Sequence, residues 1–319
     1  MNKKTTYKVI VICGVVSVSV VSILAKLSTA PSNIVSLYRA LFMLAIMLIP
    51  AIRQRHEFKS LPMKLILIGL GNGMLFGLHF DLYCDAVNYT NVASAAILTD
   101  SEILFVAPIM HFIFKERLSR LSFCGVGLVI LGSFIVTASS MGSPDAGLHG
   151  DLLSLGAAFC LAIFTICGRK LRPNMSNTVY NVLTYCGATV MLLIITGMKG
   201  TPLTGYGLQN IAVAFAMTLF CSLGGHAVFS WSLRYVEAPF ISSAKLLEPI
   251  FAAVMALFLF LEVPSIFVVI GGASIISGIV VYMKGDTEGD GERAKAEPGD
   301  AAETPPEVSE SANATSQRG

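Results

Sequence analysis

The chain has 319 residues, of which 54% are hydrophobic and 13% charged, about half the charged fraction of an average soluble domain. This balance excludes an ordinary water-soluble globular protein. The net charge of +2 says little by itself, because the charges are segregated along the chain, and the seven cysteines lie in or beside apolar runs without zinc-type spacing.

Ten apolar runs are long enough to cross a bilayer as helices, which takes roughly 20 residues each. In chain order they cover residues 8–27, 33–52, 62–86, 92–114, 119–139, 149–169, 177–198, 207–233, 238–261 and 265–284. The first run has features of a secretory signal, with small residues Ser28 and Ala30 at a cleavable spacing. Lys26 nevertheless has a counterpart in Lys170, at the end of the sixth run, so we predict that the first run is a membrane helix.

The segment from Tyr89 to Gly132 recurs 146 residues later, from Tyr235 to Gly278. The chemically unusual residues stay in register: Glu102 with Glu248, Glu116 with Glu262, Gly125 with Gly271, and Gly132 with Gly278. Internal symmetry with a buried carboxylate in each half is typical of transporters. We therefore predict a first five-helix repeat over residues 1–140 and a second over 141–284.

The positions of lysine and arginine predict the orientation in the membrane. The connections after the second, fourth and sixth helices contain several lysines and arginines. The odd-numbered connections contain almost none, apart from Lys199 in the connection after the seventh helix. Both termini are therefore expected in the cytoplasm. Because each repeat has five helices, an odd number, the second repeat should be inverted. Residues 285–319, rich in Gly, Pro, Glu and Ser, are predicted to form a disordered cytoplasmic tail.

The fourth and fifth helices of each unit carry a family likeness. The stretches LFVAPIMHFIFKERLSRLSFCGVGLVILGSFIV and LLEPIFAAVMALFLFLEVPSIFVVIGGASIISGIVV end the fourth helix on a glutamate and space the next helix with glycines. In these marks the chain resembles the ten-helix EamA-type branch of the drug/metabolite transporter superfamily, over about residues 8–284. The resemblance implies two inverted repeats around a central cavity, and transport of amino acids, nucleotide-sugars, phosphorylated sugars or lipophilic cations. Ile103 stands where the family often has the proline found here as Pro249, which leaves the bend of that helix open.

Two repeated glutamates are predicted at the membrane midplane. Glu102 lies ten residues into its helix, or about 15 Å at 1.5 Å per residue, and Glu248 lies equally deep from the opposite side. Lys245 shares a helix face with Glu248. The two could neutralise each other, or the lysine could bind a substrate carboxylate while the glutamate binds an ammonium group or a proton. The family resemblance favours a role for Glu248 in helix geometry.

Three further candidates belong to the first repeat alone. Asp100 lies about 200° around the helix from Glu102, so it either pairs with a cation such as Arg39 or faces the cavity. Arg39, with Tyr38 beside it, lies about 9 Å deep in the second helix. For Arg39 we favour an ion pair that stabilises the structure or takes part in gating, and contact with the substrate is the alternative.

Histidine and tyrosine supply the remaining candidates. His79 and Tyr83 share a face of the third helix and predict an aromatic wall in the outer part of the cavity. Tyr83 could instead anchor the helix at the interface, and His79 could be a packing residue. His226 in the eighth helix carries the same two interpretations.

The balance of buried charges predicts the solute. Four carboxylates and two cations, namely Asp81, Asp100, Glu102, Glu248, Arg39 and Lys245, favour a zwitterionic or cationic solute over a polyanion. The leading hypothesis is a secondary transporter in the plasma (inner) membrane that works by alternating access, exports an amino acid or similar metabolite, and is coupled to protons through Glu102 or Glu248. Efflux of lipophilic or quaternary cations is the alternative. A scaffold or receptor without transport activity is the alternative of another class.

Several functions lack the residues that they need. No nucleophile with its base, phosphate-binding loop or paired Cys/His ligand set is present, so we predict no enzyme, cofactor or metal. The expected partners are a small molecule and the lipid bilayer, and no nucleic acid. Gly73 and Gly77 form a GxxxG motif that is weak support for a homodimer, so monomer and homodimer both stay open.

Overall fold

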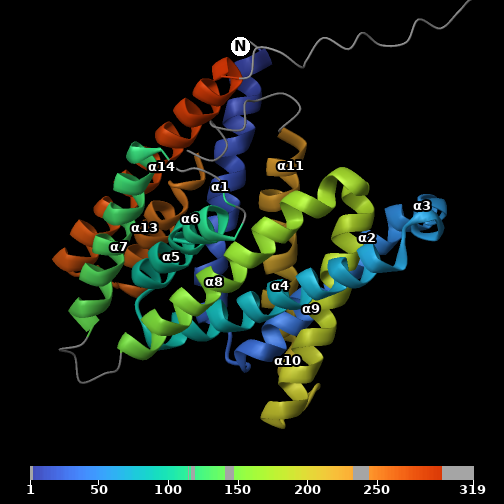
Figure 1. Ribbon diagram of the computed structural model, residues 1–319. Helices are drawn as coiled ribbons and strands as arrows, with labels where there is room; N and C mark the ends of the chain where they lie inside the picture. Colours follow the sequence, from blue (N-terminus) through green and yellow to red (C-terminus); the bar gives the residue numbers. More distant parts are fainter. Residues whose placement is uncertain (1–2, 114, 116–118, 141–146, 233–243, 297–319) are drawn as a thin grey trace, which may run out of the picture.

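The computed structural model describes residues 3–113, 115, 119–140, 147–232 and 244–296, and every regular element in these ranges is a helix (Figure 1). The first half holds α1 (Lys3–Leu27), α2 (Ser32–Arg53), α3 (Arg55–Ser60), α4 (Met63–Tyr89), α5 (Val92–Asp100), α6 (Ile103–Phe112) and α7 (Arg120–Ser140). The second holds α8 (Gly147–Leu171), the short turn η1 (Arg172–Asn174), α9 (Asn177–Lys199), α10 (Gly207–Met217), the π-helix η2 (Thr218–Ala227), α11 (Val228–Ser232), α13 (Glu248–Phe260) and α14 (Ile266–Ala296). The predicted all-helical fold class is confirmed.

The described helices suit a lipid environment. Nine stretches are long and apolar enough to cross a membrane, and α13 adds a shorter apolar helix. Large apolar side chains lie on the outside, such as Phe258, which is 78% exposed. The beginning of α1 and the end of α14 lie at the same end of the bundle (Figure 1), as an even number of crossings requires. The protein is an integral multi-pass membrane protein.

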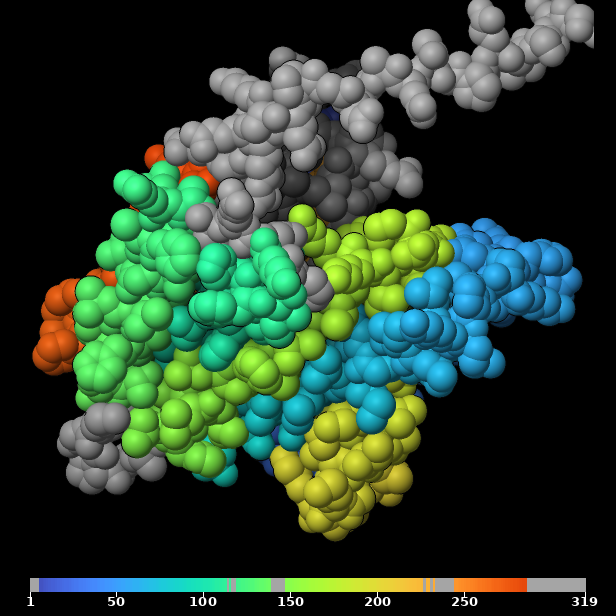
Figure 2. Space-filling view, in the orientation of Figure 1, coloured from blue at the N-terminus to red at the C-terminus, as the bar shows by residue number. Residues whose placement is uncertain are grey.

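Two features of the helix ends were not predicted. α14 continues to Ala296, beyond the expected end at residue 284, so the tail predicted to be disordered from 285 is helical in its first part. Glu, Arg, Lys and Ala, which favour helices, occupy the last turns of α14. Residues 297–319 lie outside the described residues. The short helix α3 follows α2 and projects from the body, as α10 does elsewhere (Figure 2).

The last helices of the two repeats, α7 and α14, pack against each other through glycines. A Cβ atom added at Gly125 would lie 2.6 Å from the carbonyl oxygen of Gly278, and one at Gly271 would lie 2.7 Å from that of Gly132. In the sequence repeat, Gly125 corresponds to Gly271 and Gly132 to Gly278. Gly125 therefore packs against the counterpart of Gly132, and Gly132 packs against the counterpart of Gly125. This is the pattern of two antiparallel helices related by a twofold axis.

One hydrogen bond marks the position of this axis. The hydroxyl of Ser274 donates to the carbonyl oxygen of Leu128 at 3.0 Å, and Ser274 is the repeat counterpart of Leu128, 146 residues later. A residue can touch its own counterpart only on the axis itself. Other neighbours repeat as well, since α1 packs on η2 as α8 packs on α4. The two five-helix repeats are inverted, as their odd number of helices predicted.

The GxxxG motif of α4 is used inside the chain. A Cβ atom at Gly77 would lie 2.6 Å from the carbonyl oxygen of Ala188, and Gly73 is in similarly close contact with Thr184. Both contacts are to α9. Small residues permit this close approach of helices in lipid. The face that carries the motif is thus covered by α9.

Candidate functional site

The fourth helix of each repeat is interrupted at equivalent places. In the first repeat α5 ends at Asp100 and α6 begins at Ile103, with a turn between them. In the second, a turn at residues 246–247 precedes Glu248, the first residue of α13. Adding 146 to the turn at 101–102 gives 247–248, so the two interruptions agree to within one residue. Discontinuous helices of this kind are typical of transporter binding sites.

Different local chemistry produces the two interruptions. Pro249, in the first turn of α13, lacks an N–H group, and its ring would clash with the carbonyl four residues earlier in a continuous helix. Ile103 has no such effect. Instead the hydroxyl of Ser101 donates to the carbonyl oxygen of Leu98 at 2.6 Å and competes with the helical hydrogen bond. The first repeat therefore breaks its helix without the proline.

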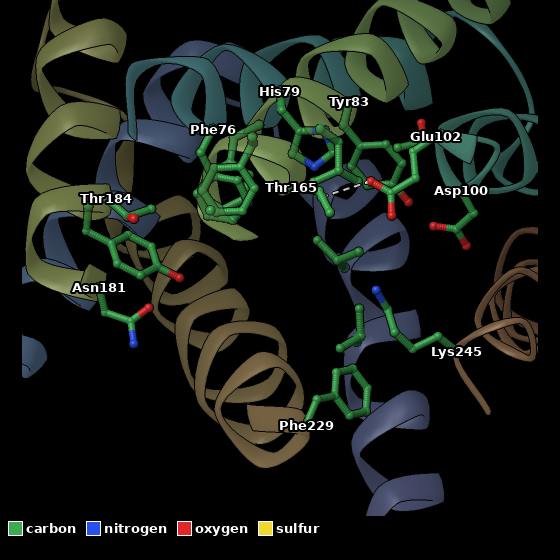
Figure 3. Close-up of a pocket in the computed structure, with 18 of the residues that line it drawn as sticks. Phe76, His79, Tyr83, Asp100, Glu102, Thr165, Asn181, Thr184, Phe229 and Lys245 are labelled. Atoms are coloured by element: carbon green, nitrogen blue, oxygen red, sulfur yellow. Dashed lines mark hydrogen bonds between the residues drawn. The ribbon is translucent and has the colours of Figure 1, made fainter. Parts of the chain in front are cut away.

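A cavity of about 570 Å³ lies beside these interruptions, within the size range of small-molecule sites. It is lined from α1, α2, α4, α8, α9, α11 and the broken helices, and Figure 3 shows many of its side chains. Of the residues proposed from the sequence, the following line it: Arg39, His79, Tyr83, Asp100, Glu102, Lys245 and Glu248. Segments more than 200 residues apart thus contribute to one site.

No ion pair within 4.0 Å joins the charged groups that line the cavity in the described structure. The ion pairs of Lys26 and Lys199 lie at one end of the bundle and do not involve the cavity. Neither the Asp100–Arg39 pair nor the Lys245–Glu248 pair considered from the sequence forms.

Arg39 and Asp100 also keep unused hydrogen-bonding atoms. Arg39 is 3% exposed, and its guanidinium group stacks on the ring of Phe80 at 4.0 Å. Its Nε atom and Oδ2 of Asp100 are buried without a hydrogen-bond partner in the described structure. Such atoms are costly unless a ligand satisfies them.

Glu102 has one polar neighbour that the sequence did not reveal. The hydroxyl of Thr165, on α8, donates to Oε2 of Glu102 at 3.1 Å (Figure 3). Asn181 and Thr184 also line the cavity, from α9. None of these three has a charge or a repeat counterpart that would have singled it out. They became visible only once α8 and α9 were placed against the broken helices.

Two residues considered from the sequence lie elsewhere, and the side chain of a third is not described. The hydroxyl of Tyr38 donates to the carbonyl oxygen of Leu203 at 2.6 Å, and Tyr38 does not line the cavity. Asp81 accepts a hydrogen bond from Lys199 at 3.1 Å and also lies outside the lining, so the cavity has three carboxylates and not four. The side chain of His226 lies outside the described part of the structure.

The cavity extends toward one end of the bundle. Arg169, Arg172, Asn177 and Asn181 line it at the junction of α8 and α9, which we call the basic end because of the cations that flank it. At the opposite end of the bundle, Lys26, Lys199, Asn210 and Glu262 do not belong to the lining. A route for a solute therefore leads from the broken helices to the basic end.

Contacts between the repeats close the opposite end. The carboxylate of Glu262 pairs with Lys26 and accepts a hydrogen bond from the backbone N–H of Val92 at 3.1 Å. Lys199 joins Asp81 and Asp85, and the side chain of Asn210 accepts from the backbone N–H of Ala30 at 3.1 Å. Each contact links a residue of the first repeat to one of the second. Opening this end requires that these contacts break.

We expect the Glu262→Ala variant to be less stable. Because the two side chains of the Lys26–Glu262 pair are 29% and 21% exposed, its loss together with that of the Val92 contact should cost about 1–2 kcal/mol. The thermal midpoint of the purified protein should fall by a few degrees. Glu262→Gln keeps an acceptor for Val92 and should lose less, and Lys59→Ala, on exposed α3, should lose nothing. An unchanged midpoint in Glu262→Ala would contradict the assignment.

A family model places the chain among known proteins. The model for the EamA-like transporter family matches residues 6–138 and again residues 148–284. The chain belongs to the EamA-like transporter family. The family resemblance noted in the sequence is thus confirmed, and the two matches cover both halves of the bundle.

Individual relatives of this EamA-like protein are distant. An uncharacterized transporter of Clostridium kluyveri is 26% identical over 61% of this chain and 65% of its own, so the match spans just under two thirds of that relative. A probable amino-acid metabolite efflux pump of Salmonella typhimurium is 23% identical over 69% of this chain and 77% of its own. One solved crystal structure matches 87% of this chain and 96% of its own with a TM-score of 0.58 at 15% identity, which shows a shared fold.

Proposed function

We propose that this EamA-like protein is a secondary transporter for an amino acid or a similar zwitterionic metabolite. One observation carries the proposal. Beside the broken helices the cavity is lined by two cations, Arg39 and Lys245, and three carboxylates, Asp100, Glu102 and Glu248, with no ion pair among them in the described structure. Arg169 and Arg172 line it farther away, at the basic end. A solute with an ammonium and a carboxylate group would complement both kinds of charge.

The cost of buried charge supports this assignment. An ionised group in a membrane interior is stabilised only by a partner of opposite charge or by water. In the empty cavity the five charged groups depend on water and on one another at a distance. Sugar phosphates and nucleotide-sugars bound beside the broken helices would place more negative charge next to the three carboxylates, where Arg39 and Lys245 are the lining cations.

The inverted repeats and their broken helices support alternating access. The cavity reaches the basic end, and ion pairs close the opposite end, which is the arrangement of one of the two required states. Under the positive-inside rule the basic end is cytoplasmic, so the state is open to the cytoplasm, with both termini on that side. We place the protein in the plasma (inner) membrane and infer export, which the names of relatives described as efflux pumps support.

Efflux of lipophilic or quaternary cations is the second candidate. The ring-rich wall of the cavity favours it, because aromatic faces attract cations. Arg39 and Lys245 disfavour it, since both would repel such a solute.

A thermal-shift screen of the purified protein tests these candidates against each other. Ligands that bind the folded state raise its stability by mass action. We expect amino acids or their derivatives to raise the thermal midpoint, and tetraalkylammonium ions and sugar phosphates to leave it unchanged. Stabilisation by organic cations alone would overturn the proposal in favour of the second candidate.

Glu102→Gln is expected to abolish solute-driven proton movement in reconstituted vesicles. Glu102 is a repeated carboxylate, predicted at the midplane, that accepts a hydrogen bond from Thr165, and glutamine keeps its size but cannot bind and release a proton. The measurement is solute flux with and without an imposed pH gradient. Glu102→Asp should retain coupling. Flux that ignores the gradient in the unaltered protein would remove proton coupling while leaving the solute assignment intact.

A further inference from the structure

The cavity wall is unusually rich in aromatic rings. Of its 25 lining residues, seven are Phe or Tyr and His79 adds an eighth ring, whereas the aliphatic side chains are Val18, Val21, Ala96 and Leu161. In the whole chain Phe, Trp and Tyr make up 9%. The fraction in the wall is thus about three times higher. An aliphatic solute would not require this composition.

Four of these rings form an ordered surface. Phe76, His79 and Tyr83 follow one face of α4, and their planes deviate by only 9° and 10° from one ring to the next, with centroids 5.9 and 6.3 Å apart. Phe164 from α8 lies over Phe76, with centroids 4.4 Å apart and planes at 18°. Two helices thus present nearly parallel rings to the cavity.

This surface is held in place before any solute binds. Nδ1 of His79 is hydrogen-bonded to the carbonyl oxygen of Ala157 at 3.0 Å, which fixes α4 against α8. Phe76, His79 and Tyr83 are largely buried. Phe164 is only partly buried, so its ring is the one that remains accessible. Phe80 is already covered by the guanidinium group of Arg39.

The charged groups lie across the cavity from Phe76. Figure 3 shows Phe76 on one side and Asp100, Glu102 and Lys245 on the other. A solute that places its ammonium and carboxylate groups among these charges directs the rest of its body toward the rings. We propose that the transported zwitterion carries a planar aromatic or heteroaromatic ring, which packs on Phe164. This inference rests on the proposed function and names the solute class of the same cavity.

The test compares two solutes that differ only in the ring. L-phenylalanine and L-cyclohexylalanine have the same charges and nearly the same size, but the second has a saturated ring. Favourable ring-to-ring contact beyond area burial corresponds to about 2–12-fold in affinity. We expect the purified protein to bind L-phenylalanine at least about fivefold more tightly, measured by competition in proteoliposomes or by thermal shift.

Three variants assign that preference to Phe164. Phe164→Leu should reduce the preference for L-phenylalanine to less than about twofold, whereas Phe164→Tyr, which keeps an aromatic face, should retain it. Phe159→Leu is the matched control, because Phe159 lies on the same helix, is 44% exposed and packs edge-on against Phe105 outside the cavity. It should leave the preference unchanged.

Each outcome separates the two levels of the proposal. Equal binding of L-phenylalanine and L-cyclohexylalanine by the unaltered protein overturns the ring assignment and leaves the zwitterion assignment in place. A preference that survives in Phe164→Leu overturns the role of Phe164. Binding of neither amino acid, nor of any other zwitterion in the screen, overturns the proposed function and the inference with it.

Discussion

Replacing Lys245 by methionine is expected to lower zwitterion transport at least tenfold, because it removes one of the two cations that line the cavity beside the broken helices. A hydrogen bond to a charged group contributes about 1.5–3 kcal/mol, which corresponds to about 10–150-fold in affinity. Methionine preserves most of the length and apolar surface of the side chain, so the packing should survive. The measurement is the apparent affinity for the solute in proteoliposomes, with size-exclusion chromatography as a check on folding.

The same variant distinguishes the two transport hypotheses by the sign of its effect. If the solute is a lipophilic cation, Lys245→Met removes a repulsion and binding should become tighter. Lys245→Arg keeps the charge and should retain part of the zwitterion transport, and Lys64→Met, at the start of α4, should retain all of it. Unchanged zwitterion affinity in Lys245→Met would show that Lys245 does not contact the solute.

Gly125→Leu is expected to destabilise the protein more than any substitution in the cavity. A Cβ atom at this position would lie 2.6 Å from the carbonyl oxygen of Gly278, so α7 and α14 would have to separate. Overpacking a tight interface costs about 1–3 kcal/mol, and more where the obstacle is backbone. In lipid no hydrophobic force draws the two helices together again. The thermal midpoint should fall by about 5–10 °C, or folded protein should not be recovered.

Gly127→Leu is the matched control for this prediction. Gly127 lies on the same helix, two residues later, and a Cβ atom there would meet nothing within 4 Å. Leucine at that position should extend toward lipid and leave the midpoint within about 1 °C of the original, as is usual for substitutions away from packed sites. Equal destabilisation by Gly125→Leu and Gly127→Leu would show that the contact with Gly278 does not set the effect, since leucine favours a helix more than glycine does at both positions.

The sequence predicted the symmetry of the fold because the repeat preserves the residues that pack closest to the axis. Gly125 and Gly271 stay in register since both face a neighbouring backbone. The extension of α14 and the short α3 were missed because composition alone determined the predicted ends. The sequence did not predict whether the helix breaks before Ile103. A proline marks such a break in the sequence, whereas a serine whose hydroxyl bonds to a carbonyl of its own helix does not.

For the candidate site, the sequence could identify charged residues whose burial in lipid costs free energy, but it could not identify the residues that they contact. Arg39, Asp100 and Lys245 stood out as charges within apolar runs, and the structure shows that they line one cavity. The pairing of Asp81 with Lys199 was missed because Lys199 was assigned to a loop, whereas it ends α9. Thr165 and Phe164 are ordinary helix residues in sequence, and only the packing of α8 against α4 gives them a place in the wall.

The hydrogen bond between Ser274 and Leu128 has a geometric consequence for the transport cycle. In alternating access by inverted repeats, each repeat adopts the shape that the other has just left. When the two repeats exchange shapes, a contact between a residue and its own counterpart joins the same two positions as before. Such a contact can therefore stay in place throughout the cycle, as a pivot between the repeats. The Lys26–Glu262 pair has no such symmetry, so the proposed mechanism requires it to open and close. Covalent linkage of residues 128 and 274 would therefore leave the cycle running, whereas linkage of residues 26 and 262 would halt it in a single state.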